Sequence, residues 1–168
     1  MANIVEITDF VGAEQVQQGK FSTKKFDPIR DEYTDPFIRQ VLGATLGNLF
    51  IANFNAATPT TLDARFQVIY DAFQDDSTGY VIESKGIKFM VKAVVWFYYA
   101  RTNNMNVSIS GNNSQVGQNS VPLSDGIFLA QNYNKGIVTA KAIQWYIEQN
   151  SATYPEYKGQ DLNYVIGL

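Results

Sequence analysis

The feature that most constrains the fold is a long central stretch, residues 84–104, which reads SKGIKFMVKAVVWFYYARTNN. Neither glycine nor proline interrupts it between residues 87 and 102, and most helical directions are apolar. A helix that is hydrophobic nearly all round lies inside a bundle or a membrane. Its uninterrupted apolar run covers only residues 93–100, whereas a membrane span needs about 20 such residues. We therefore predict the central, aromatic-rich helix of a mainly α-helical bundle.

One stripe of this helix is different in character. At 3.6 residues per turn, three lysines and two aromatic residues fall on one line: Lys85, Lys88, Lys92, Trp96 and Tyr99. Lysines can approach phosphates and aromatic rings can stack on bases, so this stripe is one candidate for contact with DNA. A lysine stripe on an otherwise buried helix is more often its one solvent-facing edge. The aromatic group Trp96-Phe97-Tyr98-Tyr99 is likewise more often core than a ligand pocket, and we prefer these interpretations.

The composition excludes several kinds of chemistry. The chain of 168 residues has no cysteine, so it has no disulfide framework, and no histidine, which is the commonest general base. Its formal charge of −3 is too small to indicate a nucleic-acid or membrane partner. The start of the chain, MANIVEITDF, lacks the basic region and apolar core of a signal peptide. We expect a single domain that acts inside a cell, with no cofactor.

Three regions are predicted along the chain. Residues 1–26 are irregular and form an N-terminal arm that packs on the domain or on a neighbour. Residues 27–150 form the helical domain, because Asp27 followed by Pro28 is a typical helix start. A second proline, Pro36, is expected to kink or restart this first helix. Residues 151–168 are expected to be an extended tail that carries tyrosines.

The apolar spacing indicates the other helices. A second helix continues to residue 55, a third covers about residues 60–73, and a long last helix covers about residues 127–149. We predict that one core joins these helices to the central one, through Phe66, Ile69, Val94, Tyr98, Leu129, Tyr133 and Ile143.

A polar excursion rich in Asn, Ser and Gly, residues 105–125, separates the central helix from the last one. It is longer than most connections in a compact domain, which have a median of about 4–6 residues. Val107 and Ile109 alternate with serines, which allows a loose β-hairpin about Gly111. We predict a projecting arm or hairpin that contacts a partner, while a passive surface loop is the alternative.

Candidate catalytic groups are few. Asp71, Asp75 and Asp76 gather near a predicted turn, but their spacing does not match that of a calcium-binding loop. A solvated turn is the simpler explanation. The glycines Gly43 and Gly47 are not followed by the Lys-Ser/Thr pair of a phosphate loop. Acid–base catalysis by carboxylates alone would need two of the 16 acids to lie together, and nothing in the sequence singles out a pair.

The order of these pieces resembles a known family. A helix closes on Gln40-Val41-Leu42-Gly43, and the next carries Leu46-Gly47-Asn48-Leu49-Phe50. After a third helix, Lys85-Gly86-Ile87-Lys88 opens the aromatic-rich helix, which ends Trp96-Phe97-Tyr98-Tyr99-Ala100-Arg101. A polar excursion and a long helix follow. Over residues 27–150, the chain resembles the head–tail connector (adaptor) proteins of tailed bacteriophages, particularly those of phages with Bacteroidetes-like hosts.

This resemblance implies a structural virion protein without catalytic residues. It implies a ring, commonly of twelve copies, that docks beneath the portal protein in the neck of the virion and is assembled in the host cytoplasm. Its partners would be copies of itself, the portal protein, other neck or tail proteins and, in passing, DNA in the channel, with no membrane. Another neck or tail-completion protein is the alternative, and a small hydrolase that uses only acids is a third.

Residues expected to contact partners come from three places. They are Val107, Ile109, Asn112, Asn113, Gln115 and Val121 in the excursion, Lys85, Lys88 and Lys92 on the central helix, and Tyr157 and Tyr164 in the tail.

Overall fold

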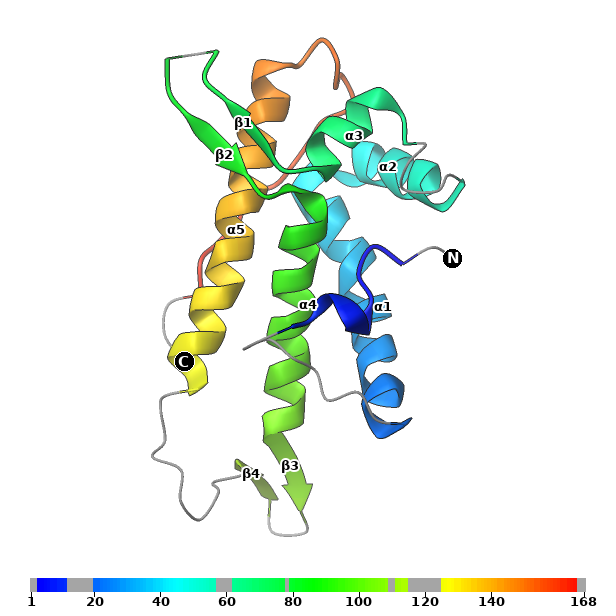
Figure 1. Cartoon of the computed structure of the whole chain (residues 1–168), viewed down its shortest axis with the longest axis vertical. Coiled ribbons are helices and arrows are strands. Elements are labelled where there is room, and N and C mark those ends of the chain that lie inside the picture. The colour runs from blue at the N-terminus through cyan, green and yellow to red at the C-terminus, as the bar shows by residue number, and fades with distance from the viewer. Residues whose placement is uncertain are drawn as a thin grey trace.

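The protein is a mainly helical bundle with two small hairpins (Figure 1). The computed structural model describes residues 3–11, 20–56, 62–77, 79–108, 111–114 and 125–165. Its helices are α1 (Lys20–Leu42), α2 (Ala44–Ala56), α3 (Ala64–Tyr70), α4 (Gly86–Asn104) and α5 (Asp125–Gln149), preceded by the short 3-10 helix η1 (Ile7–Asp9). Its strands are β1 (Phe73–Asp75), β2 (Ile82–Ser84), β3 (Met105–Ser108) and β4 (Gly111–Ser114). The predicted fold class is confirmed.

Helix α4 is the centre of the bundle, as its sequence predicts. It lies between α1 on one side and α5 on the other (Figure 1). Its residues Ile87, Met90, Val91 and Val95 are fully buried. Gly136 allows α5 to approach closely, because a Cβ there would lie 2.8 Å from the Cβ of Ala93. The close packing of α5 on α4 therefore depends on a residue without a side chain.

The predicted core joins these helices. Phe66, Ile69, Val94, Leu129 and Ile143 are buried, whereas Tyr98 and Tyr133 are half-buried and pack against that core. The ring of Tyr98 stacks on Tyr33 of α1, with 3.7 Å between the ring centroids. One hydrophobic core therefore connects α1, α3, α4 and α5, with most of the predicted residues inside it.

The predicted start of the first helix is wrong. Helix α1 begins at Lys20 rather than Asp27 and continues through both Pro28 and Pro36 without a restart. Each proline removes one backbone hydrogen bond, which normally ends or kinks a helix. Packing offsets that loss here, because Phe26, Ile29, Phe37 and Ile38 are all buried along α1. Tertiary burial therefore outweighs the local helix-start signal at Asp27. Residues 20–26 belong to the bundle rather than to an arm.

The predicted third helix is too long. Helix α3 starts with Asp63 as its N-cap, whose side chain accepts a hydrogen bond from the backbone N–H of Arg65. It ends at Tyr70, and Phe73 lies instead in β1, which pairs antiparallel with β2. The ring of Phe73 packs against Tyr146 of α5, with 4.8 Å between centroids. The stretch expected to be a simple polar turn is thus the β1–β2 hairpin.

Both terminal segments pack on the bundle. Val5 and Phe10 are almost completely buried in the N-terminal segment, and Tyr154 and Leu162 are almost completely buried in the tail. The tail returns along α5, where Asn134 exchanges two 2.9 Å hydrogen bonds with the backbone of Val165. The tail contains no helix or strand in its described part, residues 151–165, as predicted. The described residues of the N-terminal arm therefore pack on the domain itself, which is the first of the two predicted alternatives.

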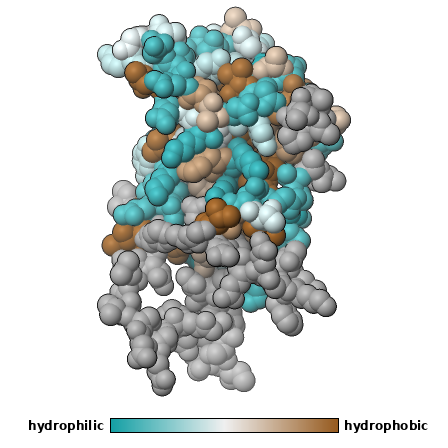
Figure 2. Space-filling view, in the orientation of Figure 1, coloured by the Kyte–Doolittle hydropathy of each residue, from teal (hydrophilic) through white to brown (hydrophobic). Residues whose placement is uncertain are grey.

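The surface is mixed in character. Figure 2 shows hydrophilic residues over most of the described face in view, with smaller hydrophobic areas between them. Large apolar side chains that are strongly exposed include Tyr80 and Val81 in the β1–β2 connection, and Val138 on α5. Within the described part of the chain, no helix is both long and apolar enough to span a membrane.

Candidate interaction surfaces

The β3–β4 hairpin follows α4 directly and lies beyond its end (Figure 1). Its strands pair antiparallel, with Val107 opposite Asn112 and Asn106 opposite Asn113. The predicted hairpin about Gly111 is therefore present. Ile109, Gln115 and Val121 lie outside the described residues. Of the six partner-contacting residues predicted here, the structure places Val107, Asn112 and Asn113 together.

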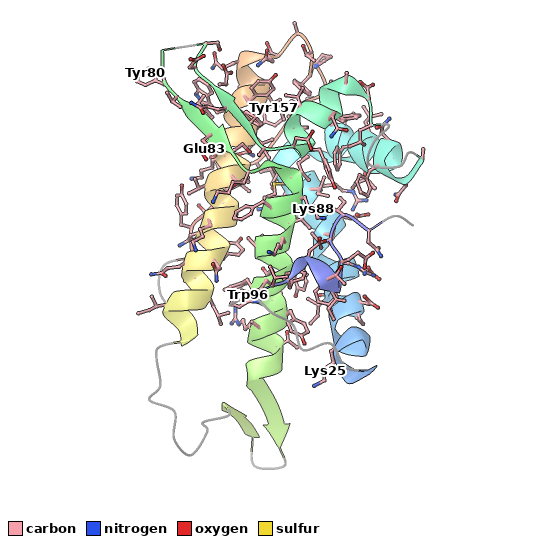
Figure 3. All side chains as sticks on the ribbon, in the orientation of Figure 1. Lys25, Tyr80, Glu83, Lys88, Trp96 and Tyr157 are labelled. Atoms are coloured by element: carbon pink, nitrogen blue, oxygen red, sulfur yellow. The ribbon has the colours of Figure 1, made fainter. Side chains whose placement is uncertain are left out.

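The lysine stripe of α4 is divided by the N-terminal segment. The Nζ atom of Lys88 lies 2.8 Å from the Asp9 carboxylate, and Lys92 lies over the ring of Phe10 at 5.6 Å. Lys85 lies over the ring of Phe89 at 4.9 Å and stays exposed. Figure 3 shows Lys88 on the side of α4 that this segment approaches. The three lysines therefore do not form one free basic stripe.

The aromatic continuation of the stripe is not a stacking surface. The exposed fraction is only 7% for Trp96 and 8% for Tyr99. Tyr99 packs against Phe26 of α1, with 5.7 Å between ring centroids, and Phe26 packs against Phe10. These rings are part of the core, as the preferred interpretation of the aromatic group predicts.

Hydrogen bonding changes the acid–base behaviour of Lys88. The hydrogen bond to the Asp9 carboxylate raises the pKa of the Lys88 ammonium, and burial opposes this effect. The ammonium is therefore fully charged at neutral pH and is already partnered within the chain. Its first role is to hold η1 against α4.

The two tail tyrosines lie in different environments. Burial raises the pKa of Tyr157 to about 12, with smaller contributions from Glu148 and Asp161. Tyr164 is 46% exposed, and the Nζ atom of Lys141 lies 4.2 Å above its ring. Of the two, Tyr164 is the one whose ring is available to a partner.

The structure also forms an acidic face that the sequence analysis missed. It consists of Glu6, Asp27, Asp31 and Asp35, of which the first three pair with Arg30 and the last pairs with Arg39. Arg30 forms ion pairs of 2.9 Å with both Asp27 and Asp31, and one of 3.5 Å with Glu6. The side chain of Arg30 is only 10% exposed. The signal in the sequence was the spacing of three aspartates at four-residue intervals, which places them on one side of a helix.

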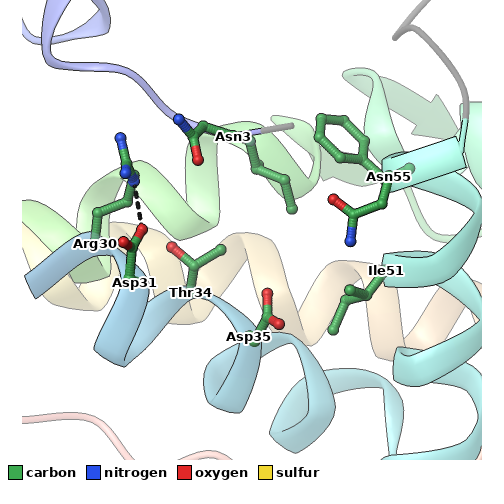
Figure 4. Close-up of a pocket in the computed structure, with 9 residues that line it drawn as sticks. Asn3, Arg30, Asp31, Thr34, Asp35, Ile51 and Asn55 are labelled. Carbon is green, nitrogen blue, oxygen red and sulfur yellow. Dashed lines mark hydrogen bonds and ion pairs between the residues drawn. The ribbon is translucent and has the colours of Figure 1, made fainter. Parts of the chain in front are cut away.

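A small cavity lies beside the acidic face, between the N-terminal segment, α1 and α2 (Figure 4). Its volume is about 70 Å³, and its lining includes Asn3, Asp31, Thr34, Asp35 and Asn55. The hydroxyl oxygen of Thr34 is buried and has no hydrogen-bond partner. A buried polar atom without a partner is uncommon in proteins. Because this oxygen is buried, a group from outside the molecule cannot reach it.

A second hollow, which we call the lysine groove, lies between the start of α4 and α5. It has a volume of about 370 Å³ and is lined by Glu83, Lys85, Phe89, Lys135, Val138 and Thr139. The Nζ atom of Lys135 donates a hydrogen bond to Asn132 at 3.2 Å. The groove combines the apolar side chains of Phe89 and Val138 with two lysine side chains.

Signs of catalysis are weak in the part of the chain that the structure describes. There, no three residues among Asp, Glu, His and Cys come together as a metal site would require. Asp75, one of the three acids near the turn, has a lowered pKa because its carboxylate accepts a hydrogen bond from the backbone N–H of Ser77. A general acid needs a raised carboxyl pKa, so Asp75 does not fit that role.

Comparisons with protein-family models, curated proteins and solved structures found no match to this chain.

Proposed function

We propose that this protein is a structural, non-enzymatic subunit of a ring between the portal and the tail of a tailed bacteriophage. The order of its sequence motifs supports this proposal, since they resemble those of head–tail connectors. The observation that carries it is the β3–β4 hairpin, which extends the chain beyond the end of α4 (Figure 1). A rigid bundle with a projecting hairpin is suited to holding neighbours in a ring while reaching a further component.

The proposed partners follow from this role. Each copy would contact two identical neighbours through two different surfaces, in a ring commonly of twelve copies, and would dock on the portal protein. Assembly would take place in the bacterial cytoplasm and the product would be part of the virion neck. A different neck or tail-completion protein remains the second candidate, since the same hairpin and bundle would suit that role. A small hydrolase is distinguished by a turnover screen, in which carboxylate-dependent activity would favour it.

Removing the hairpin tests this function. Residues 107–121 are replaced by a short Gly-Ser linker, and incorporation of the chain into phage particles is measured. We expect the linker variant to keep its helical signal but to be absent from particles. A control variant keeps residues 105–114 and replaces only residues 115–121, which separates the paired strands from the connection that follows them.

Direct imaging provides the second half of the test. The purified chain is imaged alone and within particles, and its mass in solution is measured over a range of concentrations. Rings at the portal vertex are the expected result. Normal incorporation of the linker variant would mean that the hairpin is a passive connection, and a compact monomer both in solution and in virions would contradict the ring.

A further inference from the structure

The acidic face presents carboxylates outward and keeps its cation beneath them. The side chains of Asp31, Glu6 and Asp27 are 64%, 52% and 42% exposed, whereas that of Arg30 is 10% exposed. Asp35 is partly exposed as well and has a 3.5 Å ion pair with Arg39. Four carboxylates thus face two guanidinium groups, so the face carries an excess of negative charge. Such a face attracts a cationic partner.

Carboxylates line the cavity beside this face. Asp31 and Asp35 line it together with Arg30. Figure 4 shows the ion pair between Arg30 and Asp31, with Asp35 further along the same helix. A carboxylate has several lone pairs, so each of these groups can accept a further hydrogen bond from an ammonium, which has three donors and no acceptor.

The lysine groove offers the complementary chemistry. Within the described part of the chain, neither Lys85 nor Lys135 has a carboxylate within 4.0 Å. The two lysines outnumber the one glutamate of the groove, Glu83. Val138, which lines the same groove, is 53% exposed and adds an apolar contact. Charged groups around an exposed apolar residue are the usual composition of a protein interface.

The two surfaces lie in different parts of the molecule. The acidic face belongs to the N-terminal segment and α1, whereas the lysine groove belongs to β2, α4 and α5, and the two share no residue. Helices α1 and α5 flank α4 on opposite sides (Figure 1). Two complementary surfaces at different places on one chain produce a head-to-tail interface between copies, which closes into a ring when the rotation allows it.

We infer that the acidic face of one copy binds the lysine groove of a second copy of this chain. An ammonium of Lys85 or Lys135 then lies beside the exposed carboxylates of Asp31 and Asp35. This inference rests on the proposed ring, and it adds which surfaces meet in it. Because the contact is largely electrostatic, raising the salt concentration weakens it.

Charge reversal tests this interface. Asp31→Lys on the acidic face and Lys135→Glu in the groove are each expected to weaken self-association at least about tenfold, because each brings like charges together. Association is measured by sedimentation at low and at high salt. Asp76→Lys and Lys158→Glu are matched controls, since both reverse an exposed charge outside the two surfaces and should associate like the wild type.

Mixing the two reversed chains provides the decisive experiment. In the mixture, the lysine introduced on the acidic face of the first variant meets the glutamate introduced in the groove of the second. The unchanged Asp31 of the second variant likewise meets the unchanged Lys135 of the first, so every contact between unlike chains has opposite charges. We expect the mixture to assemble although neither variant does so alone. Recovery also demonstrates that both variants fold. Failure of the mixture to assemble, with both variants folded by circular dichroism, would overturn the assignment of these surfaces.

The oligomeric state of the wild type separates this inference from the proposed ring. Unchanged association of the charge reversals, in a wild type that forms rings, would overturn this inference alone. A wild type that stays monomeric at every concentration and in particles would overturn the proposed ring together with it.

Discussion

Two hairpins flank the same helix, and they differ in how they are held. The β1–β2 hairpin precedes α4 and is tied to the body, because Phe73 packs on Tyr146 and the last residue of β2, Ser84, is almost completely buried. The β3–β4 hairpin follows α4 and lies beyond the bundle (Figure 1). The comparison indicates that a hairpin of this fold contributes to stability where a second helix packs on it. We therefore expect stability to depend on the β1–β2 end of α4, and incorporation into particles to depend on the β3–β4 end.

The largest effect on stability is expected from Phe66→Ala, in α3 at the β1–β2 end. Phe66 is 2% exposed and packs edge-on against Phe50, with 5.6 Å between ring centroids. The substitution should lower the free energy of unfolding by about 3–5 kcal/mol, because it leaves a cavity in the core. Chemical denaturation measures this. A loss below about 1 kcal/mol would mean that α3 contributes little to the core.

A second effect is expected at the joint between β2 and α4. Gly86 has a φ of +81°, and a Cβ there would lie 2.2 Å from the carbonyl oxygen of Tyr70. The substitution Gly86→Ala should lower the free energy of unfolding by about 2–4 kcal/mol, from backbone strain and overpacking together. Gly79→Ala is a matched control, since Gly79 has the same φ of +81° but nothing within 4 Å of the added atom.

The control should lose only about 1 kcal/mol, which is the cost of the left-handed backbone alone. The difference between the two unfolding free energies then measures how tightly the joint is packed. Equal losses in both variants would mean that the β1–β2 end of α4 is no more rigid than an open turn.

Alkaline pH should lower the free energy of unfolding through Tyr154, at the same end of the bundle. Tyr154 donates a 2.7 Å hydrogen bond to the carbonyl of Arg65, and burial raises its pKa to about 12. The folded protein therefore keeps the proton on this phenol at pH values at which the unfolded chain, whose tyrosine pKa is about 10, has lost it. The stabilisation is complete below pH 10 and declines as the pH rises toward 12, by about 2 kcal/mol.

Unfolding free energies between pH 8 and 12 measure this decline. Tyr154→Phe should flatten part of the slope, while it costs about 1 kcal/mol at neutral pH for the lost hydrogen bond. Tyr80→Phe is the matched control, because Tyr80 is 77% exposed and should leave the slope unchanged. An identical slope in the wild type and in Tyr154→Phe would remove this residue from the explanation.

The smallest effect on stability is expected from the Gly-Ser replacement of residues 107–121. The hairpin strands pair with each other and have few neighbours in the bundle, so the free energy of unfolding should change by less than about 0.5 kcal/mol, as for most surface changes. Thermal melting followed by circular dichroism measures it. A clear fall in melting temperature would contradict the contrast between the two hairpins.

Much of the bundle could be predicted from the sequence. Ala140, Ile143 and Ile147 are buried in α5 as their spacing predicts, because the period of 3.6 residues relates sequence directly to one face of a helix. The hairpin about Gly111 also follows from local alternation and a turn residue. These features depend on neighbours in the sequence, which is the information a single sequence contains.

Only the tertiary structure decided the rest. Helix α1 continues through Pro28 because distant residues bury its apolar side. The lysine stripe of α4 is likewise divided by a distant segment, because Lys88 pairs with Asp9 and Lys92 lies over Phe10. The acidic face likewise joins Glu6 to Asp27 and Asp31 through Arg30, although 24 residues separate Glu6 from that arginine. Helical periodicity determines which residues share a face of one helix. Packing between distant parts of the chain determines which segment covers that face, and no local pattern contains this information.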